Sequence, residues 1–167
     1  MLYIVLAVLM IALDQVIKYW AFTSLQAQQT IPLIENVFHL TYIENRGAAF
    51  SMFAQFDSRW IFVTLAVVIS IAIAVAIYEG WVQNGLGRWS LVLVGAGALG
   101  NAIDRILRGF VVDLFDFRLI HFPVFNVADI FICVGALLFI IYFMFLHKDE
   151  KQTDTTHNEF SERGSHE

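Results

Sequence analysis

Residues 125–139 read FNVADIFICVGALLF. From Ile130 onward this stretch has the composition of a membrane-spanning helix, yet Asn126 and Asp129 stand directly at its head. A carboxylate at the mouth of a lipid-embedded helix is costly to desolvate, and ionisable residues at such depth are usually functional. The stretch therefore predicts a membrane helix that begins at a polar site.

The composition of the whole chain extends this prediction. The 167 residues are 59% hydrophobic and 15% charged, with a mean hydropathy of +0.69. Crossing a bilayer takes about 20 apolar residues, and the stretches of suitable length are roughly 2–22, 60–78, 89–107 and 127–146. The first lacks the basic n-region of a cleaved signal peptide. The sequence predicts an all-α polytopic membrane protein with four transmembrane helices and both termini on one side.

The connecting segments predict structure at the membrane surface. VFHLTYIENRGAAFSMF (37–53) alternates apolar and polar residues and turns at ENRG, which predicts a small hairpin or sheet within about 30–57. Residues 109–125 are aromatic and amphipathic, which favours an interfacial loop or short helix. Residues 147–167 are polar without apolar periodicity, which predicts a disordered tail. The chain is thus one membrane domain, 1–146, followed by this tail.

The polar side chains of the predicted spans gather at one depth. A helix rises about 1.5 Å per residue, and counting along each span places them within two turns of the same interface. The second span and the opposite half of the membrane are almost purely apolar. The clustered residues are Asp14, Lys18, Asn101, Asp104 and Arg105, with Asp113 and Asp129 at that interface and Asn45 and Arg46 in a loop on the same side.

Structural interpretations of these residues compete with functional ones. Asp14 and Lys18 are four residues apart, as in a neutralising ion pair on one helix face. Arg105 has the length to reach the interface from within the membrane. Cys133 is the single cysteine and is expected to be a small packing residue, which leaves no disulfide within the chain. His39 and His121 have no partner at ligand spacing, so we expect neither a metal nor a cofactor.

Two carboxylates at one interface indicate a chemistry. If Asp113 and Asp129 meet, they cannot both ionise easily and the pair shares a proton. In aspartic proteases one such carboxylate takes a proton from water while the other polarises the scissile carbonyl. A proton or ion relay uses the same residue types. Composition and spacing leave open a peptidase-like enzyme, a small transporter and a non-catalytic assembly factor. Because the polar residues stop in one membrane half, the enzyme is favoured over a transport pathway.

Five blocks of sequence resemble those of a known family. In order they are DQVIK (14–18), ENRGAAFS (44–51), GNAIDR (100–105), GFVVD (109–113) and FNVAD (125–129). They resemble the signature blocks of the bacterial type II, or lipoprotein, signal peptidase, over roughly residues 1–147. The resemblance implies four helices with a periplasmic β-cradle and an interfacial helical loop that covers the site. It also implies an aspartic endopeptidase that cuts prolipoproteins just before a diacylglyceryl-modified cysteine.

The resemblance assigns roles residue by residue. It implies that Asp113 and Asp129 form the catalytic dyad. It places three polar residues along the active site, and four more where they shape the site or bind substrate. The first group is Asn101, Arg105 and Asn126; the second is Asp14, Lys18, Asn45 and Gly47.

The resemblance also implies a cellular setting. It predicts an inner-membrane protein with both termini in the cytoplasm and the site near the periplasmic face. Its partners would be prolipoprotein substrates, membrane lipids and inhibitors of the globomycin type, with no metal, no cofactor and no nucleic acid, and the protein would be a monomer. The distribution of Lys and Arg does not by itself decide the orientation. When the motif residues are left out of the count, the two sides carry similar numbers of basic residues. The outer side has Arg59, Arg108 and Arg118, and the inner side has Arg88, Lys148, Lys151 and Arg163.

Overall fold

In the computed structural model, the described residues are 1–47 and 59–147. The last part of the predicted surface segment, 48–58, and the polar tail from 148 onward lie outside the described residues.

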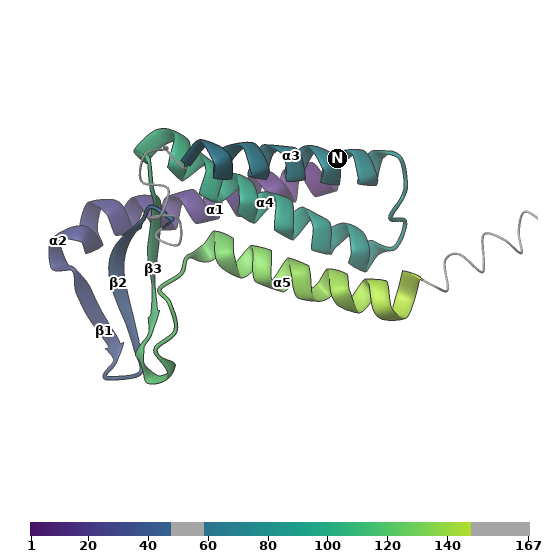
Figure 1. Ribbon diagram of the computed structural model, residues 1–167. Helices are drawn as coiled ribbons and strands as arrows, with labels where there is room; N and C mark the ends of the chain where they lie inside the picture. The colour runs from purple at the N-terminus through teal and green to yellow at the C-terminus, as the bar shows by residue number, and fades with distance from the viewer. Residues whose placement is uncertain (48–58, 148–167) are drawn as a thin grey trace, which may run out of the picture.

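Four long helices form an elongated antiparallel bundle (Figure 1). They are α1 (Leu2–Trp20), α3 (Arg59–Tyr78), α4 (Gly85–Arg108) and α5 (Val127–Ile141). α1 continues through the π-helical turn η1 (Ala21–Leu25) into α2 (Gln26–Gln28), and α5 continues through η4 (Tyr142–Leu146). Within the described residues, these four helical segments are long and apolar enough to cross a membrane.

Local capping explains where α4 begins and ends. Its start precedes the expected residue 89, because the Asn84 side chain accepts a hydrogen bond from the Leu86 N–H at 2.8 Å and caps the helix. Its end is set by Gly109, whose φ of 83° is a left-handed conformation that favours glycine. α4 therefore includes one more turn at its start than hydropathy alone indicated.

A three-stranded antiparallel sheet extends to one side of the bundle (Figure 1). Its strands are β1 (Thr30–Ile34), β2 (Phe38–Asn45) and β3 (Val111–Phe117), in the order β1-β2-β3. The third strand corrects the expectation that 109–125 is an interfacial loop or short helix. Helical structure in that segment is one 3₁₀ turn, η3 (Arg118–Ile120).

The physical reason for this correction is a long-range pairing. β3 aligns with β2 so that Phe117 faces Phe38 and Asp113 faces Ile43. The rings of Phe38 and Phe117 lie 4.6 Å apart, which stabilises the register across the strands. The aromatic and amphipathic pattern of the segment is compatible with either a surface helix or a strand. Pairing with β2, about 70 positions earlier in the chain, selects the strand.

Small residues let α4 and α5 approach closely. A Cβ on Gly97 would collide with the carbonyl oxygen of Ala128, and one on Gly135 would lie 2.7 Å from the carbonyl oxygen of Ser90. Gly97 therefore permits the close approach of α4 to α5. Cys133, expected to pack inside, is exposed instead, because two residues turn a helix by about 200° and place it opposite Gly135.

A second core joins the sheet to the end of α1. Ala21 and Leu25 of η1 are fully buried against the sheet. Their partners are Tyr42 of β2 and Val112 and Leu114 of β3. This core fixes the base of β3, and with it Asp113, against the bundle.

Candidate active site

The clustered polar residues of the sequence meet at one end of the bundle. The end of α4, the start of α5, and strands β2 and β3 converge there (Figure 1). Asp113 of β3 is 2% exposed. Asp129 lies in the first turn of α5 and is half-buried. A strand and the first turn of a helix, rather than the middle of a span, thus hold the two carboxylates.

Asn126 joins the two aspartates. Its side-chain Nδ2 donates to Asp113 Oδ1 at 2.6 Å, and its backbone N–H donates to Asp129 Oδ2 at 3.1 Å. Asn126 is also the N-cap of α5, since its Oδ1 accepts from the Asp129 N–H at 3.0 Å. This reciprocal capping box fixes the orientation of the Asn126 amide. The helix cap therefore aims the Asn126 donor at Asp113.

Each aspartate has a further amide partner on its other oxygen. Asn45 Nδ2 donates to Asp113 Oδ2 at 2.9 Å. Asn101 Nδ2 donates to Asp129 Oδ1 at 2.8 Å. All four carboxylate oxygens consequently accept a hydrogen bond, which fixes the rotamers of both side chains.

Asp113 has an altered acidity. Burial raises the pKa of Asp113 to about 6, and the charge of Asp129 acts in the same direction, against the hydrogen bonds from Asn126 and Asn45 that lower it. A carboxyl group with such a pKa both gives and accepts protons near neutral pH.

Gly47 positions Asn45. The Gly47 N–H donates to Asn45 Oδ1 at 2.9 Å, which leaves the Asn45 Nδ2 directed at Asp113. Gly47 has a φ of 79°, and a Cβ there would lie 2.9 Å from Cε2 of Phe62. Both the backbone conformation and the lack of space require glycine at this position.

Lys18 and Asp14 are more than the simple ion pair that their spacing suggests. Lys18 Nζ is fully buried and lies 3.0 Å from Asp14 Oδ2 and 3.4 Å from Asp104 Oδ2. It also donates to Asn101 Oδ1 at 2.8 Å, so the amide group of Asn101 faces Asp129. Lys18 thereby orients a partner of the candidate site.

Asp14 holds the start of α5. Its Oδ1 accepts a hydrogen bond from the Ala128 N–H at 2.9 Å, in the first turn of that helix. Gly100 makes room for this contact, since a Cβ there would lie 2.7 Å from Asp14 Oδ2. A negative charge at a helix N-terminus is favourable. Asp14 therefore fixes the helix end that carries Asp129.

Asp104 belongs to the polar cluster, but no sequence pattern assigned it a role. It is fully buried, is paired with Lys18 and Arg108, and its Oδ2 accepts from the Val112 N–H at 3.1 Å. Val112 directly precedes Asp113, so Asp104 ties α4 to the strand of the candidate site. The position of Asp104 within the block GNAIDR could have suggested a role for it. Its hydrogen bond with the Val112 backbone N–H cannot be predicted from the sequence.

Arg105 lies beside the carboxylates. Its guanidinium stands 4.6 Å from the centre of the Phe62 ring, and its Nη1 donates to the Asn101 carbonyl oxygen at 3.3 Å. Its charge interacts with those of Asp129 and Asp113. Among the described residues, no aspartate or glutamate forms an ion pair with it.

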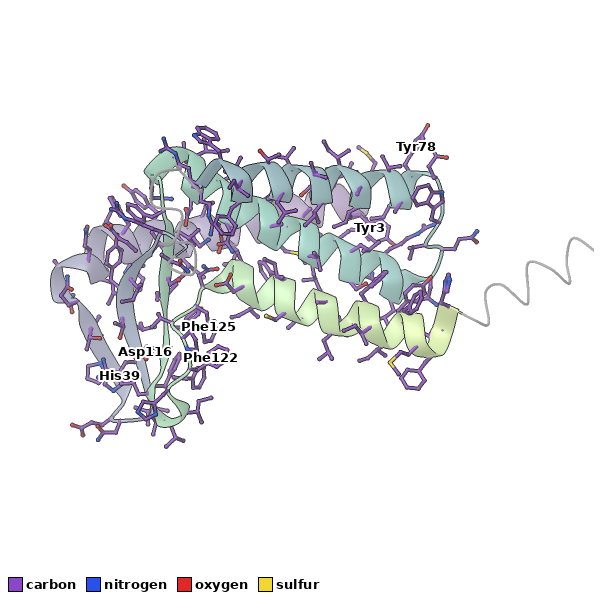
Figure 2. All side chains as sticks on the ribbon, viewed as in Figure 1. Tyr3, His39, Tyr78, Asp116, Phe122 and Phe125 are labelled. Carbon is purple, nitrogen blue, oxygen red and sulfur yellow. The ribbon has the colours of Figure 1, made fainter. Side chains whose placement is uncertain are left out.

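Arg46 and Arg118, which the sequence places on the outer side, form ion pairs with acidic residues other than Asp113 and Asp129. Arg46 pairs with the partly exposed Glu44 at 3.0 Å. Asp116 pairs with Arg118 at 2.9 Å toward the far end of the sheet (Figure 2). Within residues 1–47 and 59–147, no group of three or more His, Cys, Asp and Glu side chains is arranged to hold a metal ion.

The sequence is similar to those of known proteins. The family model described as signal peptidase II matches residues 6–145. The chain belongs to this family. The lipoprotein signal peptidase of Clostridioides difficile is 44% identical over 151 residues, covering 90% of this chain and 100% of that protein. The lipoprotein signal peptidase of Photorhabdus laumondii is 42% identical over 150 residues, covering 87% of this chain and 89% of that protein.

Solved structures agree with the signal peptidase II assignment. A bacterial membrane enzyme superimposes with a TM-score of 0.78 at 32% identity, covering 86% of this chain and 93% of that one. A second has a TM-score of 0.75 at 32% identity. With its four apolar helices, the chain is a multi-pass membrane protein of the signal peptidase II family.

Proposed function

We propose that the protein is an aspartic endopeptidase that removes signal peptides from prolipoproteins by cutting just before the diacylglyceryl-modified cysteine. One observation carries this proposal: Asn126 is hydrogen-bonded to both Asp113 and Asp129. Membership of the signal peptidase II family supports the substrate class. An unmodified cysteine would lack the lipid anchor that brings the scissile bond to the membrane surface.

In the proposed reaction the two aspartates share one proton. The ionised carboxylate removes a proton from water as the water oxygen attacks the scissile carbonyl carbon, while the protonated carboxyl group donates to the developing oxyanion. Collapse of the tetrahedral intermediate breaks the C–N bond. The leaving amine takes the proton that the first carboxylate removed from water, and the oxyanion's proton returns to the second carboxylate, so the dyad again shares one proton. The pKa of about 6 for Asp113 suits this proton exchange. The reaction consumes one water and needs no metal or cofactor.

The neighbouring residues position the substrate and the dyad. We assign Asn101 and Arg105 to holding substrate carbonyl groups, and Asn126 to holding the dyad together. Asp14, Lys18, Asn45 and Gly47 shape the site through the contacts described above. We also assign to the segment 109–125 the role of covering the site during cleavage.

The position of the site at the end of the bundle supports a membrane setting for the proposed reaction. A substrate anchored by its acyl chains reaches this depth by lateral diffusion. We place the protein in the inner membrane as a monomer, with both termini in the cytoplasm and the site near the periplasmic face. Membrane lipids and globomycin-type inhibitors are its further partners.

The function is tested with purified protein in lipid nanodiscs. We expect it to cleave a diacylglyceryl-modified prolipoprotein on the N-terminal side of the modified cysteine, with the products identified by mass spectrometry. The same prolipoprotein with an unmodified cysteine is the control and should be cut far more slowly. Absence of cleavage, together with proton or ion flux in liposomes, would favour the transporter interpretation instead.

The shifted acidity of Asp113 predicts how stability depends on pH. Its folded pKa of about 6 lies above the usual aspartate value of 3.8, so the folded state binds a proton more firmly than the unfolded state between those two pH values. The stability that Asp113 contributes is therefore present below about pH 4 and is lost as the pH rises through about 6. Relative to Asp113→Asn, we expect the unfolding free energy of the wild type to fall by up to about 3 kcal/mol over this range.

Asp116 provides a control of opposite sign on the same strand. Burial alone would raise its pKa, but the hydrogen bonds from Thr41 and Arg118 hold the pKa of Asp116 below its usual value. Relative to Asp116→Asn, the wild type should lose stability as the pH falls through the acid range. Unfolding midpoints in detergent at several pH values measure both differences. If the stability differences for Asp113 and Asp116 changed with pH in the same direction, the opposite pKa shifts assigned to these two residues would be wrong.

Gly47→Ala should reduce cleavage through Asn45. A left-handed conformation costs a residue with a Cβ roughly 1–2 kcal/mol, and the new Cβ also meets Phe62. Gly80→Ala is the matched control, since Gly80 has a φ of 72° but nothing lies within 4 Å of an added Cβ. We expect a loss of stability in both variants and a loss of about tenfold or more in cleavage rate for Gly47→Ala. Equal cleavage rates for the two variants would show that Gly47 does not position Asn45.

A further inference from the structure

A cavity of about 670 Å³ lies at the end of the bundle opposite to Asp113 and Asp129. α1 and α3 both pack against α4, and the cavity opens between them. Ala7 of α1, Ile73 and Ala74 of α3, and Gly95 of α4 line its walls, and Tyr3 and Tyr78 also belong to its lining. Figure 2 shows these two tyrosines at the end of the bundle away from the sheet. We call this space the apolar cavity.

The lining of the apolar cavity offers little to a polar ligand. Apart from the two tyrosines at the outer end, the side chain with a polar group is Ser70, and its hydroxyl already donates to the Ala66 carbonyl oxygen at 2.8 Å. A buried polar ligand group would therefore lack partners, which is costly. The chemistry of the walls suits a hydrocarbon chain.

The depth of the apolar cavity matches one leaflet. Its lining extends along α3 from Tyr78, the last residue of the helix, to Ser70, a span of about 12 Å at 1.5 Å per residue. Half of the hydrocarbon core of a bilayer is about 15 Å. At the open end, the rings of Tyr3 and Trp89 meet edge to face at 5.0 Å, and aromatic pairs of this kind are typical of the membrane–water interface.

The size of the apolar cavity favours an acyl chain over a helix as its occupant. A helix with its side chains is about 10–12 Å across, so 12 Å of helix takes up roughly 1,000 Å³ or more. The signal peptide of a substrate or a helix of a second copy is too large to be enclosed within 670 Å³ and would contact the cavity with one face only. The cavity also continues into the apolar outer surfaces of α1 and α3, where Ile4 is 66% and Val75 43% exposed. Those surfaces are apolar and exposed, as helix faces that contact acyl chains would be.

We propose that the apolar cavity binds an acyl chain of a phospholipid from the leaflet opposite to the Asp113/Asp129 site. The chain fills the space between α1 and α3, with the phospholipid head group at the level of Tyr3 and Tyr78. This site is separate from the proposed cleavage reaction and does not depend on it.

Replacing either of two alanines of α3 by tryptophan tests the proposal. Ala74→Trp fills the cavity, whereas Ala72→Trp places the same side chain two residues earlier at an exposed position outside the lining. Purified proteins are stripped of lipid in detergent and incubated with palmitoyl-oleoyl phosphatidylethanolamine, and bound lipid is counted by native mass spectrometry. We expect the wild type and Ala72→Trp to carry the phospholipid adduct and Ala74→Trp to lose it.

A second measurement needs no substitution. A phosphatidylethanolamine with a photoreactive group in its acyl chain is irradiated with the wild-type protein, and the labelled residues are identified. We expect labelling at Ile73 and Leu99 inside the apolar cavity. Unchanged lipid binding by Ala74→Trp, or labelling confined to outward-facing residues, would overturn the proposal. An increased KM for prolipoprotein in Ala74→Trp with lipid binding retained would also overturn it, in favour of the signal peptide.

Discussion

Asp113→Asn and Asp129→Asn should each abolish cleavage of a diacylglyceryl-modified prolipoprotein. Either amide is close to the size of the carboxylate but cannot exchange the proton that the proposed reaction requires. Loss of a residue that acts in general acid–base catalysis typically costs 10²–10⁴-fold in rate. We expect the upper end, about 10⁴-fold, because the proposed dyad works as a unit. The measurement is single-turnover cleavage in nanodiscs.

Asp116→Asn is the matched control for this experiment. Asp116 lies on the same strand as Asp113, three residues further along, and its contacts are with Thr41 and Arg118. Its loss should leave the cleavage rate within a few fold of the wild type. All three variants are compared for their unfolding midpoint, so that misfolding is detected separately. Cleavage at near wild-type rates by either dyad variant would refute the aspartic mechanism.

Asn126→Ala is expected to have the second largest effect. It removes the donor to Asp113 Oδ1 and the N-cap of α5 together. Loss of an N-cap costs about 1 kcal/mol of stability, and a buried acceptor left without its partner costs roughly 1–3 kcal/mol more. Because the Asp113 carboxylate loses a donor and the Asp129 backbone N–H loses the side-chain oxygen that caps it, we expect the cleavage rate to fall by about 10²-fold or more.

Two further variants separate the cap from the site. Asn84→Ala removes the N-cap of α4, which accepts from the Leu86 N–H and lies at the opposite end of the bundle. It should lower the unfolding midpoint but preserve cleavage. Asn126→Ser restores a capping hydroxyl without the donor that reaches Asp113. We expect recovered stability without recovered activity, and full activity of Asn126→Ser would show that Asn126 acts as a cap alone.

The sequence alone was sufficient for the membrane architecture. Apolar runs of spanning length and the rise per residue of a helix are local properties, so they predicted four spans and one polar depth that the structure describes as four apolar helices with a polar end. The same counting brought Asp14, Lys18 and Asn101 to the level of Asp129. The five sequence blocks that resemble the family indicated which of these residues belong to one site.

Only the tertiary structure decided how these residues are held. Residues 111–117 form a strand because β2 supplies hydrogen-bond and aromatic partners from a distant part of the chain. Asp14 and Asp104 have their roles because each accepts a hydrogen bond from a backbone N–H, of Ala128 and Val112 respectively. Backbone partners carry no side-chain signature, so no residue pattern announces them. Hydropathy and helix geometry therefore determined where the polar site lies, whereas long-range hydrogen bonds determined which atoms face one another within it.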